Sequence, residues 1–199
     1  MTDLKRLTPD ADHRATAAAK RLAAAAAEHG LVDVALGELD SPIGRLTVAV
    51  TRHGLARVVF ASEDRDRAVE NLSRRLSPRI LEAPAMTDAV RRALEAYFTG
   101  SLTRFDLRLD RRLMTPFSRE VLGATARVGY GDLATYGEVA ARIGHPKAAR
   151  AVGAALGSNP IPIVVPCHRV VGAGGRLTGY AGGLERKEFL LRLEGSLAM

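Results

Sequence analysis

The sequence has almost no cysteine: Cys167 is the only one among 199 residues. An intramolecular disulfide is therefore excluded, and so is a zinc site built on several thiolates. Two uses remain for this thiol, which are burial as a small apolar side chain or chemical reactivity.

The sequence also lacks a long apolar run. No stretch approaches the roughly 20 residues that a membrane-spanning helix needs. The first thirty residues are rich in Arg and Ala, but scattered acidic residues argue against a transit peptide. We therefore expect a cytoplasmic protein that does not contact a membrane.

Acidic residues are outnumbered, 22 against 29 basic ones, which gives a formal net charge of +7 and a pI of about 10.2. A pI above roughly 9 is typical of nucleic-acid-binding proteins. A well-solvated, arginine-rich surface explains the same charge equally well, so charge alone decides nothing.

Residues 1–30 are predicted to form an appended helix. Thr8 is suited to cap it, Pro9 to occupy its first position and Gly30 to end it. The low-complexity alanines in this segment carry no chemistry.

Residues 31–112 change to a strand pattern. Three short apolar segments separated by Gly- and Pro-containing turns predict an antiparallel meander. No group of residues here has chemical meaning, so we interpret this half as scaffold. The expected strands are 34–39, 46–50 and 55–60, with helices over 64–76 and 87–98 and a further short strand over 105–109.

A linker is expected at 110–113, and residues 113–199 are predicted to be mostly helical. Thr135 and Glu138 have the spacing of a capping box, which puts Tyr136 in the first turn of a helix. This helix and the next, joined by a tight glycine turn, have the outline of a helix-turn-helix. The helices are expected at 116–126, 136–144, 147–156 and 184–193, and the apolar run 161–165 is expected to be a buried strand.

The second helix of this pair is unusual for one that reads base edges. It offers Ala149, Ala151 and Gly153 with a single arginine, Arg150. Small side chains let a helix approach a narrow minor groove, and a lone arginine can enter between bases. From this segment alone, the simpler interpretation is that the alanines pack against another helix and that Arg150 is a surface charge.

Cys167 is followed directly by His168, after Pro166. Neighbouring residues of a strand point to opposite faces, so adjacency alone does not make a reactive pair. A turn at the proline could bring both side chains to one side, and the Gly-rich stretch 172–183 could then wall a pocket.

The run Pro166-Cys167-His168-Arg169-Val170 resembles the active-site signature of the O6-alkylguanine-DNA alkyltransferases. The resemblance covers residues 116–195 in order, including 147–153, 158–160 and 179–184. Residues 31–112 are more loosely similar to the family's small domain, and residues 1–30 match nothing in it. The resemblance implies an α/β (α+β) fold: a ribonuclease H-like N-terminal domain with a three-stranded antiparallel sheet, and a winged-helix-like C-terminal domain.

The resemblance also implies roles for individual residues. Cys167 would be the nucleophile, His168 would take its proton through a water, and Glu194 would orient the imidazole. Asn159 would brace the turn that carries the cysteine. Tyr136 would rotate a backbone phosphate and donate a hydrogen bond to guanine N3.

DNA contact would come from Arg150, which would fill the place of the extruded base, together with the small residues Ala149, Ala151 and Gly153. The substrate pocket would include Pro162, Val170, Tyr180 and Ala181. Ala181 departs from some relatives, which carry a hydroxyl residue there, so tolerance for bulky alkyl groups is left open.

The implied function is direct DNA repair, by irreversible transfer of an alkyl group from O6-alkylguanine, and from O4-alkylthymine, in double-stranded DNA to Cys167. The product is a thioether, so each chain would react once. No cofactor and no metal are expected, and the chain is expected to act as a monomer, with cooperative assembly on DNA left open. The alternatives are a lesion-binding protein without chemistry and a DNA-independent thiol hydrolase or redox sensor.

Overall fold

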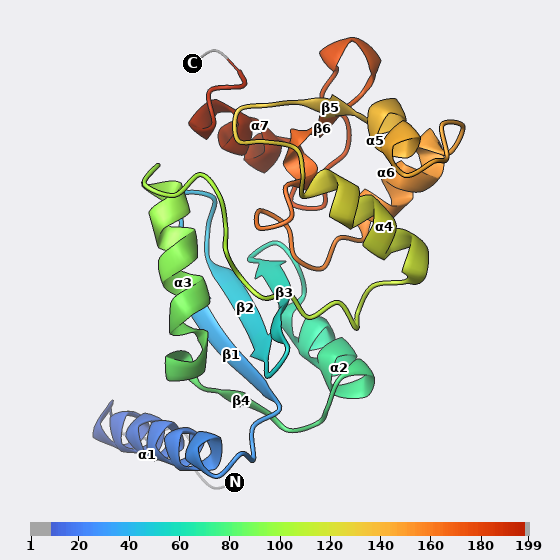
Figure 1. Cartoon of the computed structure of the whole chain (residues 1–199). Coiled ribbons are helices and arrows are strands. Elements are labelled where there is room, and N and C mark those ends of the chain that lie inside the picture. The colour runs from blue at the N-terminus through green and yellow to red at the C-terminus, as the bar shows by residue number, and fades with distance from the viewer. Residues whose placement is uncertain (1–8, 198–199) are drawn as a thin grey trace, which may run out of the picture.

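The computed structural model describes residues 9–197, in two units joined by one linker (Figure 1). A sheet unit with its helices occupies one half, and a mostly helical unit occupies the other. The expected cap Thr8 lies outside the described residues. No helix within 9–197 is both long and apolar enough to cross a membrane.

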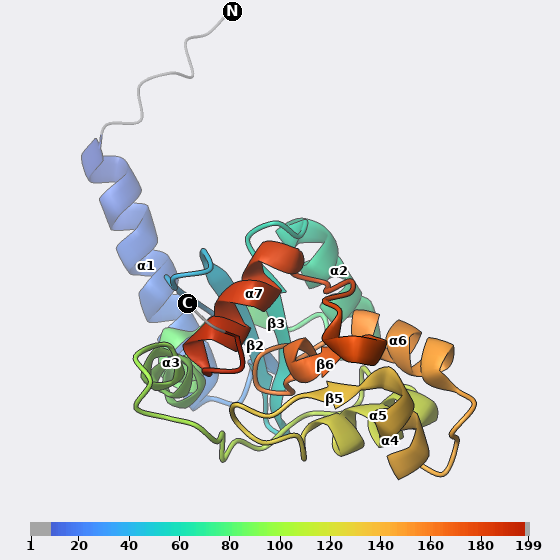
Figure 2. The same cartoon turned by 90° about the horizontal axis from the view of Figure 1, so that it is seen from above.

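Helix α1 (Pro9–Glu28) is the expected appended helix. It ends where Gly30 adopts a φ of 65° and the Leu31 N–H donates to the Ala26 carbonyl at 2.8 Å. Its last turns pack on the sheet unit, where Ala26 meets Val32 and Ala83. The rest projects outward (Figure 2).

The predicted meander is present as β1 (Val34–Leu39), β2 (Leu46–Thr51) and β3 (Gly54–Phe60). A fourth strand, β4 (Ile80–Glu82), pairs in parallel with β1, so the order is β3-β2-β1-β4. The expectation of a three-stranded sheet was therefore wrong by one strand. Three residues are too few to show the alternation of apolar and polar side chains that predicts a strand. Strand β4 is defined by its backbone pairing with the edge of β1.

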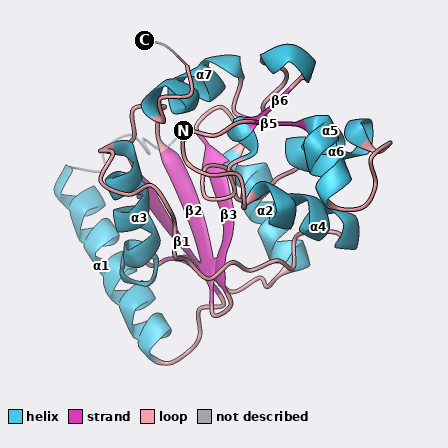
Figure 3. Ribbon diagram, turned by 45° about the horizontal axis from the view of Figure 1, so that its top comes forward, coloured by secondary structure: helices cyan, strands magenta, loops and turns pink. Residues whose placement is uncertain are grey.

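Two helices cover opposite faces of this sheet (Figure 3). Helix α2 (Arg65–Arg75), capped by Asp64, buries Leu72 against Val34 and Leu36. Helix α3 (Pro84–Phe98) lies along β1 and β2. It begins one turn earlier than predicted, because Pro84 is well suited to the first helical turn.

Residues 105–109 form no strand beyond a single bridge between Leu109 and Leu55. The Leu55 N–H donates to the Arg108 carbonyl at 2.9 Å, and the Asp110 N–H donates to the Leu55 carbonyl at 2.8 Å. The approach is so close that a Cβ on Gly54, whose φ is 120°, would lie 2.1 Å from the Arg108 oxygen. Glycine is required at this position.

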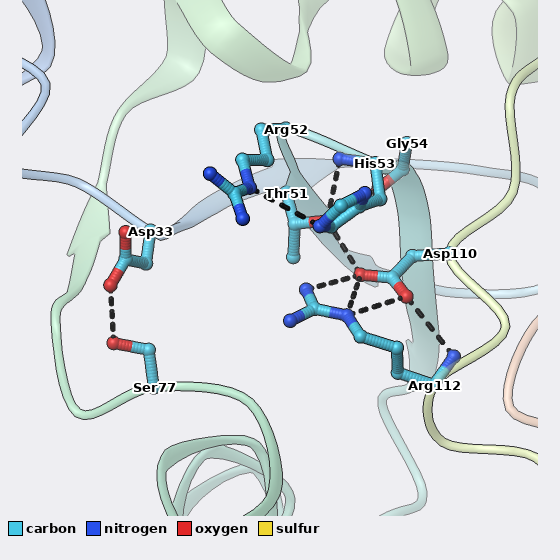
Figure 4. Close-up of polar contacts among 8 residues, drawn as sticks. All are labelled: Asp33, Thr51, Arg52, His53, Gly54, Ser77, Asp110 and Arg112. Carbon is cyan, nitrogen blue, oxygen red and sulfur yellow. Dashed lines mark hydrogen bonds and ion pairs between the residues drawn. The ribbon is translucent and has the colours of Figure 1, made fainter.

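The start of the linker is anchored by the buried carboxylate of Asp110 (Figure 4). It accepts hydrogen bonds from the Thr51 hydroxyl at 2.6 Å and from the Arg112 guanidinium at 2.6 Å. The connection between the two units is therefore fixed to the β2–β3 turn.

The second unit contains α4 (Pro116–Thr125), α5 (Tyr136–Arg142), α6 (Ala149–Gly157) and α7 (Leu184–Leu193). The predicted capping box of Thr135 and Glu138 is present, and α6 packs against α4 and α5. A short parallel pair, β5 (Ala134–Thr135) and β6 (Val170–Val171), ties the start of α5 to the segment after the cysteine.

The prediction of a buried strand over 161–165 was wrong. The segment is buried but turns back on itself: the Val165 N–H donates to the Ile161 carbonyl at 2.9 Å, and Ile163 has a φ of 72°. Pro162 and Pro166 have no N–H to give to a strand ladder. Cys167 therefore opens a short 3-10 helix, η1 (Cys167–Arg169), instead of ending a strand.

Candidate active site

The thiol of Cys167 is held by Asn159. The Asn159 Nδ2 atom lies 3.2 Å from the sulfur and also donates to the Val165 carbonyl at 3.0 Å. Its Oδ1 atom accepts from the Ile161 N–H at 3.0 Å. One amide thus fixes the turn 161–165 and points a donor at the sulfur.

Cys167 is only 5 % exposed. Burial raises the pKa of its thiol to about 11, although the Asn159 donor and the Lys187 ammonium favour the thiolate. The resting group is therefore a thiol, and a base must take its proton when the sulfur reacts.

His168 supplies such a base. Its Nε2 atom lies 2.9 Å from Glu194 Oε1, while its buried Nδ1 atom has no hydrogen-bond partner in the described part of the chain. An ionised Glu194 only accepts hydrogen bonds, so Nε2 carries the proton and the lone pair of Nδ1 is free. Burial lowers the pKa of His168 more than Glu194 raises it, which keeps the imidazole neutral at pH 7.

Glu194, at the end of α7, is buried yet ionised. Burial alone would raise its pKa, but hydrogen bonds from His168 and Arg169 lower it to about 2. Arg169 donates from Nε to Oε2 at 2.8 Å and from Nη2 to Oε1 at 2.9 Å. Tyr97 donates its hydroxyl to Oε1 at 2.6 Å.

Comparison with known proteins matches most of the chain to the family that the sequence around Cys167 resembles. Residues 34–111 match the family model described as 6-O-methylguanine DNA methyltransferase, ribonuclease-like domain, and residues 116–196 match its DNA binding domain. A methylated-DNA–protein-cysteine methyltransferase of Methanosarcina acetivorans is 46% identical over 79% of this chain and 96% of its own length. The chain belongs to the methylated-DNA–protein-cysteine methyltransferase family.

Solved structures of the family have the same fold. A crystal structure of Mycobacterium tuberculosis OGT in complex with DNA is 43% identical, with a TM-score of 0.71, over 82% of this chain and 94% of that one. The O6-methylguanine-DNA methyltransferase of the archaeon Pyrococcus kodakaraensis is 28% identical, with a TM-score of 0.59, over 81% and 99%.

The methyltransferase carries a groove of about 570 Å³ at the α5–α6 pair. Four of the residues predicted to contact DNA line it: Tyr136, Ala149, Arg150 and Gly153. The Tyr136 hydroxyl lies 2.8 Å from Thr178 Oγ1 on the opposite wall. Ala151 is exposed on α6 but outside the lining.

The predicted pocket residues are not gathered around one opening. Pro162 and Val170 are buried, and Ala181 is exposed. The Tyr180 ring packs edge-on against Phe60 and His168, with centroid distances of 5.9 and 6.4 Å. Cys167 is not among the residues that line the groove.

The methyltransferase site includes three residues to which the sequence analysis gave no role: Tyr97, Arg169 and Lys187. Lys187 Nζ donates to the Val170 carbonyl at 2.6 Å and to the Thr178 carbonyl at 3.2 Å. Lys187 precedes Leu190 and Leu191 by three and four positions, and this helical spacing indicates its buried face. No sequence motif near Tyr97 indicates a role in the site, and residues 31–112, which include it, were interpreted as scaffold.

Proposed function

We propose that this protein repairs DNA directly, by transferring a methyl or other alkyl group from guanine O6 in double-stranded DNA irreversibly to Cys167. One observation carries the proposal: Asn159 holds the only thiol of the chain, and the next residue, His168, has a buried ring nitrogen with no hydrogen-bond partner in the described part of the chain. The family supports it, since its members are named for transfer from methylated DNA to a protein cysteine.

The proposed reaction begins with the proton of Cys167, which moves through a water to His168 Nδ1. The sulfur attacks the alkyl carbon, so the S–C bond forms as the C–O6 bond breaks, and guanine leaves with the bonding electrons. Glu194 stabilises the imidazolium, and the Tyr136 hydroxyl donates to guanine N3 as negative charge develops. The resulting thioether is not hydrolysed by water, so each chain acts once.

We propose that α6 enters the minor groove, with Arg150 taking the place of the extruded base. Ala149, Ala151 and Gly153 permit close approach because their side chains are small. The DNA complex of the M. tuberculosis relative supports DNA as the partner.

The extruded guanine must then reach the sulfur. Since Cys167 is nearly buried and does not line the groove, we propose that the loop 172–183 shifts and that the Tyr136–Thr178 hydrogen bond opens. Tyr180 would then wall the base pocket, with Pro162, Val170 and Ala181 around it.

Three further assignments belong to the same proposal. The chain divides into the extension 1–30, a sheet domain 31–112 and an alkyltransferase domain 113–199. It acts as a monomer in the cytoplasm, and O4-alkylthymine is a second substrate.

A Cys167→Ala variant separates this function from lesion binding without chemistry. We expect the variant to bind a duplex containing O6-methylguanine as tightly as the wild type does but to remove no methyl group from it. Equal loss of methyl from the DNA with both proteins would refute the proposal. Repeated, DNA-independent turnover of thioesters by the wild type would instead support a thiol hydrolase.

A further inference from the structure

Tyr97 joins the sheet unit to the site. It lies near the end of α3, and its ring is fully buried among Phe98, Phe105 and Tyr130. The end of α3 approaches the end of α7 in two views (Figures 1 and 2), and there the Tyr97 hydroxyl donates to Glu194 Oε1 at 2.6 Å.

We infer that Tyr97 is a positioning residue of the alkyl-transfer site, whose hydroxyl acts through Glu194 to set the pH at which His168 is free to accept a proton. The inference rests on the proposed function. It makes the N-terminal half part of the chemistry and not only its scaffold.

The argument starts from the number of donors at one oxygen. Glu194 Oε1 accepts from Tyr97, from His168 and from Arg169. An O–H···O⁻ contact of 2.6 Å falls in the range of strong, charge-assisted hydrogen bonds. The hydroxyl therefore stabilises the negative charge of Glu194. The carboxylate then stabilises the His168 imidazolium less than it would without this donor.

Tyr97 remains a donor throughout the working range. Burial, followed by the negative charge of Glu194, raises the pKa of its phenol far above the usual value. Without this donor the carboxylate would attract a proton more strongly, and the pKa of the His168–Glu194 pair would rise.

Other charged and titratable groups also face this pair, from several elements. A Tyr97→Phe change leaves all of them in place, so a shift in the titration would report the missing hydroxyl. They are Arg169 and Cys167 on η1, Lys187 on α7, Tyr130 in the loop after α4, and Tyr180 in the loop before α7.

The test compares Tyr97→Phe with Tyr130→Phe. Both changes remove one hydroxyl from the same aromatic cluster and keep the ring contacts that support the fold. The Tyr130 hydroxyl donates to the Leu193 carbonyl at 3.0 Å and does not touch the Glu194 carboxylate. The full chain is titrated while the imidazole NMR signals of His168 are followed, and the rate of methyl transfer is measured over the same pH range.

For Tyr97→Phe we expect the pKa of His168 to rise by about one unit, which is a tenfold change in the protonation equilibrium. Methyl transfer should therefore be up to about tenfold slower on the acid side and should approach the wild-type rate at higher pH. Tyr130→Phe should follow the wild-type titration.

An unchanged or lowered pKa of His168 in Tyr97→Phe would overturn the inference. Equal shifts in the two variants would also overturn it, because they would indicate general loosening of the cluster. The titration needs no DNA, so its outcome is separate from that of the proposed function, which is tested by methyl transfer from DNA to Cys167.

Discussion

Replacing Asn159 by alanine removes one side chain that makes three contacts around the nucleophile. Its amide nitrogen donates to the Val165 carbonyl and to the Cys167 sulfur, and its oxygen accepts from the Ile161 N–H. Val165 and Ile161 are buried, at 2 % and 0 % exposed, so water cannot easily replace these partners.

The expected losses follow from the kinds of group left without a partner. The Val165 carbonyl keeps the Cys167 N–H as a donor at 2.8 Å, so only the Ile161 N–H loses its partner. A buried backbone group without a hydrogen bond costs about 1–3 kcal/mol, so the free energy of unfolding should fall by about 1–3 kcal/mol. A hydrogen bond to a charged group contributes about 1.5–3 kcal/mol. Losing it from the reacting thiolate should slow methyl transfer roughly ten- to hundredfold.

The single thiol makes the assay simple. Because Cys167 is the only cysteine, the pH dependence of its reaction with iodoacetamide gives its pKa, about 11 in the wild type and higher in the variant. Unfolding in urea is followed by circular dichroism, since the chain has no tryptophan. Ser158→Ala is the matched control, because its hydroxyl donates only to the Ala155 carbonyl, at 3.1 Å.

If Asn159→Ala transferred methyl at the wild-type rate and its thiol titrated as in the wild type, the role assigned to this amide would be wrong. A loss of stability equal to that of Ser158→Ala would contradict the three-contact reasoning in the same way.

Three further predictions concern DNA, the linker and pH. Arg150→Ala should slow repair in duplex DNA by roughly tenfold, because the inserted side chain offsets part of the unstacking energy. The reaction with free O6-benzylguanine should be nearly unchanged. Equal losses with both substrates would contradict insertion of Arg150 into the duplex. Asp110→Asn should lower the free energy of unfolding by about 2 kcal/mol, since it removes a buried carboxylate that accepts from the Arg112 guanidinium and the Thr51 hydroxyl. A change within error in urea unfolding would contradict the anchoring of the linker. Burial lowers the pKa of His168 below the usual value of 6.5, so below that pH the unfolded chain binds a proton at this residue more readily than the folded chain does. The free energy of unfolding, measured in urea, should therefore be highest above about pH 6.5 and should decrease as the pH falls below it. The pKa of Glu194 is about 2 in the folded chain against 4.5 in the unfolded chain, so a second decline should follow between pH 4.5 and 2. A profile that is flat from pH 7 to 4.5 would refute the first assignment, and one that is flat from pH 4.5 to 2 would refute the second.

Features coded by a few neighbouring residues were predictable. The capping box at Thr135 and Glu138 follows from local hydrogen bonding, and the meander of β1 to β3 follows from short apolar segments separated by turns. The segment 161–165 misled because a continuous apolar run fits a buried strand and a buried turn equally well. Pro162 within the segment and Pro166 directly after it were the better guide.

The chemistry of the site was only partly readable. Cys167 and His168 are adjacent in the sequence, and their family signature led to Asn159 and Glu194. The contact of Tyr97 with Glu194 joins residues 97 positions apart and depends on how α3 meets α7, which no local pattern contains.

The most direct test of Cys167 as the acceptor is the mass of the whole protein after reaction with excess duplex containing O6-methylguanine, followed by peptide mapping. We predict one methyl group per chain, located on the peptide that contains Cys167, and no further gain with time. An unmodified Cys167 peptide, with methyl on another residue or with methyl lost from the DNA and absent from the protein, would contradict the mechanism.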